Sequence, residues 1–246
     1  MERDVSTIIE HLESQNLNGI STGLYLLENL LKNLLPSIEK SYRKTTTQST
    51  PHAQQVLEFL DLQNNFSFNL TSVLIRIYRY DLSPKDILTS NKLLQGLLLL
   101  HPQSKTVFNK SENMELILEL LNYSFSGYDQ SLNIIISAIT TLMHILLKNY
   151  NNYRVFEANN GCKTIIKNLR LNSINDINNL NDLENNSLSL VQQNLNYKII
   201  EFLMFYTMDE QDNPNPITTE EKVAFFKDEF PEINALVESL NKLIDL

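Results

Sequence analysis

Residue types that commonly carry out chemistry are few and scattered in this sequence. The four histidines lie far apart, at His11, His52, His101 and His144, so none has the close spacing that places two metal ligands on one helix face. The five glycines never cluster, which excludes the standard phosphate-binding loop and dinucleotide fingerprint. No acidic run has the order of a calcium loop. The sequence therefore predicts no metal site, no cofactor and no catalytic constellation.

The single cysteine, Cys162, is the one conspicuous nucleophile. It follows Gly161 and begins an apolar helical stretch, and a helix N-terminus can lower the pKa of a thiol. The alternative, which we favour, is that Cys162 is a small buried residue of the kind that packs inside a helical repeat. His144 lies on an apolar helix and is interpreted in the same way, as a core or edge residue.

Composition favours helices and a protein partner. Only five glycines and seven prolines interrupt 246 residues, of which 42% are hydrophobic, a pattern typical of long helices joined by short turns. The net charge of −9 argues against nucleic acid or an anionic membrane as the main partner. The apolar runs 93–100 and 134–147 are shorter than the roughly 20 residues that span a bilayer. With one cysteine and no secretory signal in residues 1–10, a cytoplasmic or nuclear location is expected.

Apolar residues recur at helical spacing along most of the chain. Ser83-Pro84 predicts a helix start and His101-Pro102 its end, while Thr218 with Glu221 predicts a capping box. Loops are expected at 43–51 and in an asparagine-rich insertion at 171–187. Helices are expected near residues 5–12, 24–35, 56–62, 70–80, 84–100, 114–121, 132–147, 165–169, 188–206, 219–226 and 231–243.

One stretch of the sequence is repeated after 48 residues. Ser104 to Phe108, followed by the apolar positions Met114 to Leu121, resembles Asn152 to Phe156, followed by Cys162 to Leu169. A long helix, a short helix ending in Val-Phe and a further apolar helix form the plan of an armadillo-like unit. The sequence thus predicts an all-α fold, an armadillo-like right-handed helical solenoid forming a single domain over residues 1–246. An irregular helical bundle is the alternative.

Three passages resemble a fungal family. They are Leu94-Gln-Gly-Leu-Leu-Leu-Leu-His-Pro-Gln-Ser104, Asn152-Tyr-Arg-Val-Phe-Glu157 with Gly161, and Lys198-Ile-Ile-Glu-Phe-Leu-Met-Phe-Tyr-Thr-Met208. The family is the septation initiation network component named cell division control protein fourteen, which is distinct from the phosphatase of the same name. The likeness covers roughly residues 85–210. This chain departs from it at the asparagine-rich insertion and at Asp209, where a proline is expected before the acidic residue Glu210.

The resemblance implies a non-enzymatic subunit that binds a sterile-twenty-like protein kinase of the germinal-centre class. Such complexes act at the spindle pole body to trigger septation and cytokinesis, so the resemblance adds that site to the expected cytoplasmic location. It implies a protein partner and no small-molecule substrate.

Candidate partner-binding residues lie on two predicted helices. On the later one, Glu201, Phe202, Phe205 and Tyr206 fall on two adjacent faces; they either form the core, which we favour, or flank a groove for a partner. On the earlier one, Arg76 and Arg79 could face an acidic partner, although a solvated helix face with extended side chains is the favoured interpretation.

Two other classes of function stay open. A general armadillo-type adaptor for transport or vesicle machinery would bind linear peptides in a long groove. An enzyme would need Cys162 as its nucleophile, and we consider this the weakest of the three.

Overall fold

The computed structural model describes residues 1–43, 51–124, 127–170 and 190–244. Within these ranges every regular element is a helix and no strand occurs, so the all-α class is confirmed. The chain divides into two compact units, residues 1–108 and 109–246, and each unit is described by itself. Most of the predicted loop at 43–51 and the predicted insertion at 171–187 fall outside the described residues. The solenoid and the single domain stay predictions.

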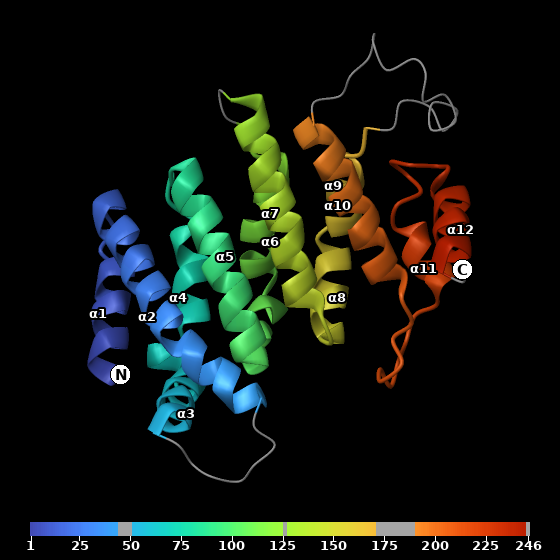
Figure 1. Cartoon of the computed structure of the whole chain (residues 1–246). Helices are drawn as coiled ribbons and strands as arrows, with labels where there is room; N and C mark the ends of the chain where they lie inside the picture. Colours follow the sequence, from blue (N-terminus) through green and yellow to red (C-terminus); the bar gives the residue numbers. More distant parts are fainter. Residues whose placement is uncertain (44–50, 125–126, 171–189, 245–246) are drawn as a thin grey trace. The chain divides into compact units, whose positions relative to one another are not determined.

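The first unit is a two-layer arrangement of helices. Helix α2 packs on α1, α3 and α5, while α4 packs on α1 and α5 (Figure 1). The apolar faces of these helices form the core of the unit, with Val5, Leu24, Leu74 and Leu94 all at most 1% exposed. The elements are α1 (Glu2–Leu12), α2 (Leu17–Arg43), α3 (Pro51–Asn64), η1 (Phe66–Phe68), α4 (Leu70–Ile77), α5 (Pro84–Leu100) and η2 (Pro102–Asn109).

Helix α5 begins and ends where the sequence predicts. The Ser83 side chain accepts a hydrogen bond from the backbone N–H of Asp86, and Pro84 occupies the first helical position. The helix ends at Leu100, immediately before His101-Pro102, because the residue before proline avoids helical angles.

His101 joins three elements of the first unit. Its Nε2 lies 2.9 Å from Asn64 Oδ1 at the end of α3, and its Nδ1 lies 2.7 Å from Ser104 Oγ. Since Asn64 Oδ1 only accepts, Nε2 carries the ring proton and Nδ1 accepts from the Ser104 hydroxyl. Ser104 Oγ in turn accepts from Asn69 Nδ2, the residue that caps α4. Burial lowers the pKa of His101 and keeps the ring neutral, so this histidine has a structural role.

The second unit also has helices in two layers. Helix α7 packs along α10, and α6 and α8 pack against α7 and against each other, while α11 and α12 pack on α10 (Figure 1). The elements are α6 (Ser111–Glu119), η3 (Leu120–Asn122), α7 (Tyr128–Leu146), α8 (Tyr150–Ala158), α9 (Gly161–Ile166), α10 (Leu190–Thr207), α11 (Thr219–Ala224) and α12 (Ile233–Ile244).

The 48-residue repeat corresponds to a repeated order of elements. A long helix, α5 or α7, is followed by a short helical segment that begins at Pro102 in one copy and at Tyr150 in the other. The phenylalanines at the ends of the two short segments, Phe108 and Phe156, are both fully buried. Met114 and Cys162, at matching positions of the next helix, are buried as well. The predicted order of elements therefore occurs twice along the chain, and Cys162 is buried, as the comparison of the two copies predicts.

Two glycines give a matched test of the packing. A Cβ at Gly161 would lie 2.2 Å from the Phe156 ring, whereas a Cβ at Gly96 within α5 would meet nothing within 4 Å. We expect Gly161→Ala to lower the free energy of unfolding by about 1–3 kcal/mol through overpacking. Gly96→Ala should raise it by about 0.5–1 kcal/mol, because alanine reduces the entropy lost when the helix forms. Urea unfolding of both variants measures these changes in the free energy of unfolding. Equal changes in the two variants would contradict the packing described around Phe156.

Candidate functional site

The predicted site residues on α10 point in different directions. Phe202 and Tyr206 are fully buried, in agreement with the core interpretation, and Phe205 is half-buried beside Tyr153, with ring centroids 6.1 Å apart. Glu201 is exposed and accepts a hydrogen bond from Lys198 Nζ at 2.5 Å. Only Glu201 and part of Phe205 are therefore open to a partner, and a role of the four in partner binding stays a prediction.

The two predicted arginines lie in the first unit. Arg76 is in the last turn of α4 and forms an ion pair with Glu13, and both side chains are nearly half exposed. Such surface pairs contribute at most about 1 kcal/mol. Arg79 follows α4 and is exposed. Both arginines therefore lie at the surface, and their binding of an acidic partner also stays a prediction.

The second unit contains a buried network of charges that the sequence did not reveal. Glu210 and Lys222 have side chains only 1% exposed, and Lys222 Nζ lies 3.3 Å from Glu210 Oε1. Arg154 Nη2 donates to the same Glu210 oxygen at 2.6 Å. Asn213 donates a further hydrogen bond to Glu210. One carboxylate from the loop after α10 thus joins α8 to α11.

A second carboxylate completes the network. Glu157 Oε1 accepts a 2.6 Å hydrogen bond from the Tyr206 hydroxyl, and Glu157 Oε2 lies 3.1 Å from Arg154 Nε. The network therefore sets two cations, Arg154 and Lys222, against two carboxylates. Balanced charge matters because an uncompensated charge in the protein interior costs several kcal/mol.

Aromatic rings enclose this network. The Tyr206 ring stacks on Phe202 and Tyr153, with centroids 5.8 and 5.6 Å apart, and meets Phe226 edge-on at 5.6 Å. Lys222 Nζ lies 5.4 Å from the centroid of Tyr153 and 5.7 Å from that of Tyr206, within the range of cation–π attraction. Tyr206 thus connects the aromatic core to the ion pairs.

Local sequence explains how Lys222 reaches the interior. Thr218 and Glu221 form the predicted capping box, which starts α11 and fixes the direction of its first turn. Thr219 Oγ1 donates to the Thr207 carbonyl at 3.2 Å, and Lys222 Nζ donates to the Met208 carbonyl at 2.6 Å. The start of α11 is therefore held against the end of α10.

The chemistry of this region is that of a closed core. Burial is the main cause that raises the pKa values of Cys162, Tyr153 and Tyr206 above their ordinary values. A protonated, buried thiol is a poor nucleophile, which argues against Cys162 in catalysis. Among the described residues, no group of three histidine, cysteine or acidic side chains could hold a metal ion. No helix in the described ranges is long and apolar enough to cross a membrane.

These features define an all-helical protein in which the charged groups around Glu210 are paired with one another, with Glu157, Glu210 and Lys222 buried and Arg154 partly exposed. The chain belongs to the family of cell division control protein 14, SIN component, whose pattern it matches over residues 1–217. The resemblance seen in the three sequence passages is thereby confirmed. The family is a non-catalytic component of septation signalling and is not the phosphatase. No curated protein and no solved structure matches the chain.

The buried ion pair between Glu210 and Lys222 predicts a large effect of neutralisation. Lys222→Met keeps the length of the side chain but leaves Glu210, among the described residues, with Arg154 as its one cationic partner. We expect the free energy of unfolding to fall by about 3 kcal/mol, the lower end for breaking a buried pair. Lys227→Met is the matched control: its side chain is exposed, and the change should stay within about 0.5 kcal/mol. Similar losses in the two variants would contradict the network.

Glu157 predicts a pH dependence of stability. Burial, with a smaller contribution from Glu210, raises its pKa above the ordinary 4.5. Because the folded state then binds the proton more tightly than the unfolded state, stability falls as the pH rises through the folded pKa. The difference in unfolding free energy, wild type minus Glu157→Gln, should therefore decrease as the pH rises above 4.5 and level off once the pH exceeds the folded pKa.

Glu221→Gln provides a control of opposite sign for the Glu157 measurement. Hydrogen bonds from Thr218 lower the pKa of Glu221, so its contribution is present above pH 4.5 and is lost as the pH falls through the folded pKa. The difference in unfolding free energy, wild type minus Glu221→Gln, should therefore increase with pH. Urea unfolding at a series of pH values below and above 4.5 measures both differences. Slopes of the same sign would contradict the opposite pKa shifts of Glu157 and Glu221.

Proposed function

We propose that this protein is a non-catalytic regulatory subunit that binds a sterile-twenty-like protein kinase of the germinal-centre class and acts in septation and cytokinesis. The observation that carries the proposal is the family match, which covers residues 1–217. The three passages Leu94 to Ser104, Asn152 to Glu157 and Lys198 to Met208 support it, since all lie within the matched segment. The proposed location is the cytoplasm, including the spindle pole body.

The arrangement of polar groups supports a function through the surface. Arg154, Glu157, Glu210 and Lys222 satisfy one another inside the second unit, and Cys162 is buried. An armadillo-like solenoid, which we propose from the repeated elements around Phe108 and Phe156, would offer an extended surface to a partner.

Affinity purification of the full-length chain from its own cells tests the proposal. A sterile-twenty-like kinase should be recovered in about equal molar amount, and the two purified proteins should migrate together on a sizing column. The Gly96→Ala variant, which alters an open position within α5, should recover as much kinase as the wild type. Consistent absence of the kinase would disprove the proposal. Recovery of many proteins through short linear peptides would instead indicate a general adaptor.

A further inference from the structure

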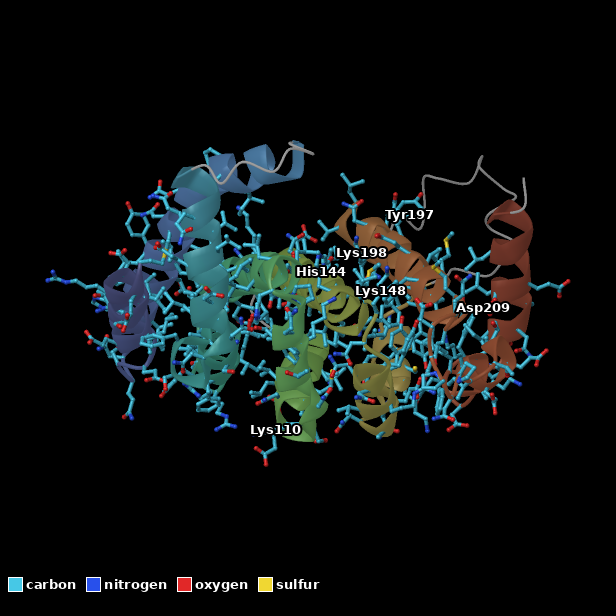
Figure 2. All side chains as sticks on the ribbon, turned by 90° about the horizontal axis from the view of Figure 1, so that it is seen from below. Lys110, His144, Lys148, Tyr197, Lys198 and Asp209 are labelled. Atoms are coloured by element: carbon cyan, nitrogen blue, oxygen red, sulfur yellow. The ribbon has the colours of Figure 1, made fainter. Side chains whose placement is uncertain are left out.

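Residues 218–240, which we call the arm, contain α11 and most of α12 and pack on α10 (Figure 1). Most of their side chains are exposed. The loop before the arm, residues 208–217, contains two prolines, and its Asp209, labelled in Figure 2, is exposed. The arm is therefore attached to the second unit through a small set of buried side chains, which are Lys222, Val223, Phe226, Ile233 and Val237.

Lys222 of the arm lies in a site whose groups suit an ammonium ion. Its Nζ donates to the Met208 carbonyl at 2.6 Å and lies 3.3 Å from Glu210 Oε1. The same nitrogen lies 5.4 Å from the ring centroid of Tyr153 and 5.7 Å from that of Tyr206. Carbonyl and carboxylate oxygens and aromatic rings are the groups that bind an alkylammonium ion in proteins. We call Tyr153, Tyr206, Glu210 and the Met208 carbonyl the lysine site.

A second side chain of the arm contacts the same site. Phe226 lies four residues after Lys222, is fully buried, and meets the Tyr206 ring edge-on with the centroids 5.6 Å apart. Tyr206 thus contacts both the lysine and the aromatic ring of the arm. The spacing of these two side chains is therefore matched to the lysine site.

The lysine site and its occupant fall on different sides of the end of the family pattern. Every residue of the lysine site lies within the matched segment 1–217, whereas the arm begins at Thr218, immediately after it. The matched segment supplies the network with Arg154, Glu157 and Glu210, which are two carboxylates and one cation. Within that segment the network is thus one cation short, and the lysine that completes it comes from outside.

The arm is also held to α9 by ion pairs at the surface. Lys163 Nζ lies 2.6 Å from Asp228 Oδ2, and Lys167 Nζ lies 3.2 Å from Glu229 Oε1, with all four side chains partly exposed. Such pairs contribute little to stability, because water screens them. When the arm opens, water reaches both the lysine site and the lysine that leaves it, so no charge is left in an apolar environment.

We propose that the arm is an autoinhibitory segment, which fills the lysine site in cis and gives way to a helical segment of the protein partner. That segment presents a lysine to Glu210 and, four residues later, an aromatic ring to Tyr206, as Lys222 and Phe226 do within the chain. The proposal rests on the proposed function, because it assumes a protein partner. It adds the place and the chemistry of binding, and a contact that regulates access.

Amide hydrogen exchange of the full-length chain tests whether the arm opens by itself. Asp228→Lys sets a like charge against Lys163 and should speed exchange across residues 219–237 about fivefold, with α7 unchanged. Adding Lys163→Glu restores an ion pair of reversed sign and should return exchange to the wild-type rate. Equal acceleration in the arm and in α7, or none in the arm, would overturn the inference.

A fluorescent peptide of residues 218–240 tests the lysine site with the full-length chain. It should bind the Asp228→Lys chain about fivefold more tightly than the wild-type chain, because apparent affinity follows the fraction of chains whose site is open. A peptide with Lys222→Met should bind neither chain. A peptide with Lys227→Met, an exposed position, is the matched control and should bind like the unchanged peptide. Equal binding of the two altered peptides would overturn the lysine site.

Competition in cell extract tests the occupant of the site. The Asp228→Lys chain should recover more kinase than the wild-type chain. The unchanged 218–240 peptide should displace this kinase, and the peptide with Lys222→Met should not. Crosslinking of the bound kinase, followed by peptide mapping, should find a lysine and an aromatic residue four positions later in the segment that contacts the chain.

The outcomes separate this inference from the proposed function. Displacement of the kinase by the unchanged peptide alone supports both. Displacement of another protein whose mapped segment has the lysine and aromatic spacing supports the lysine site and overturns the kinase as its occupant. Recovery of the kinase that neither Asp228→Lys nor the peptide alters overturns the inference and leaves the proposed function. A dimer in which two copies exchange their arms overturns a partner segment as the occupant.

Discussion

The structure of the second unit depends on compensating three buried charges, those of Glu157, Glu210 and Lys222, with the help of the partly exposed Arg154. Removing a carboxylate or an ammonium from water costs several kcal/mol, and attraction between the charges offsets this only when each one is paired. Glu210 satisfies the condition by meeting both Arg154 and Lys222, and Glu157 does so by meeting Arg154 and the Tyr206 hydroxyl. Such a network fixes how α8, α10 and α11 pack, because a shift of any one of them leaves a charge exposed to an apolar environment.

The aromatic rings and the ion pairs depend on each other. Tyr206 stacks on Phe202 and Tyr153 and at the same time donates to Glu157. The rings exclude water, which strengthens the electrostatic attraction around Lys222. The charges in turn hold the rings in one arrangement. A core of this kind is rigid, and it leaves the opposite side of α10 free to carry exposed residues without loss of stability.

Local and periodic features of this chain could be predicted from the sequence. The caps at Ser83 and Thr218 were predictable because a cap involves residues three apart. The repeated order of elements followed from matching positions 48 apart, such as Phe108 and Phe156. The family followed from passages of continuous sequence, and it is confirmed over residues 1–217.

The buried network could not be predicted in the same way. Arg154 and Glu210 are 56 residues apart, and Glu210 and Lys222 are separated by a loop containing two prolines. No periodicity connects such positions, and acidic or basic residues are expected at the surface unless they are paired. The only signal was that Arg154 and Glu157 lie within a family-like passage and that Glu210 stands where the family has an acidic residue. For Phe202 and Tyr206, a role in the core could be distinguished from a contact with a partner only once the neighbours of α10 were known.

The position of Lys222 also has a consequence for how the protein is made. Lys222 lies beyond the segment 1–217 that carries the family pattern, and it follows the other three members of the network in the sequence. During synthesis Arg154, Glu157 and Glu210 all emerge before it, so the network of the nascent second unit holds two carboxylates and one cation until Lys222 has emerged. Domains usually fold as units as they leave the ribosome. For this unit, the final folding step must wait until Lys222 has left the ribosome.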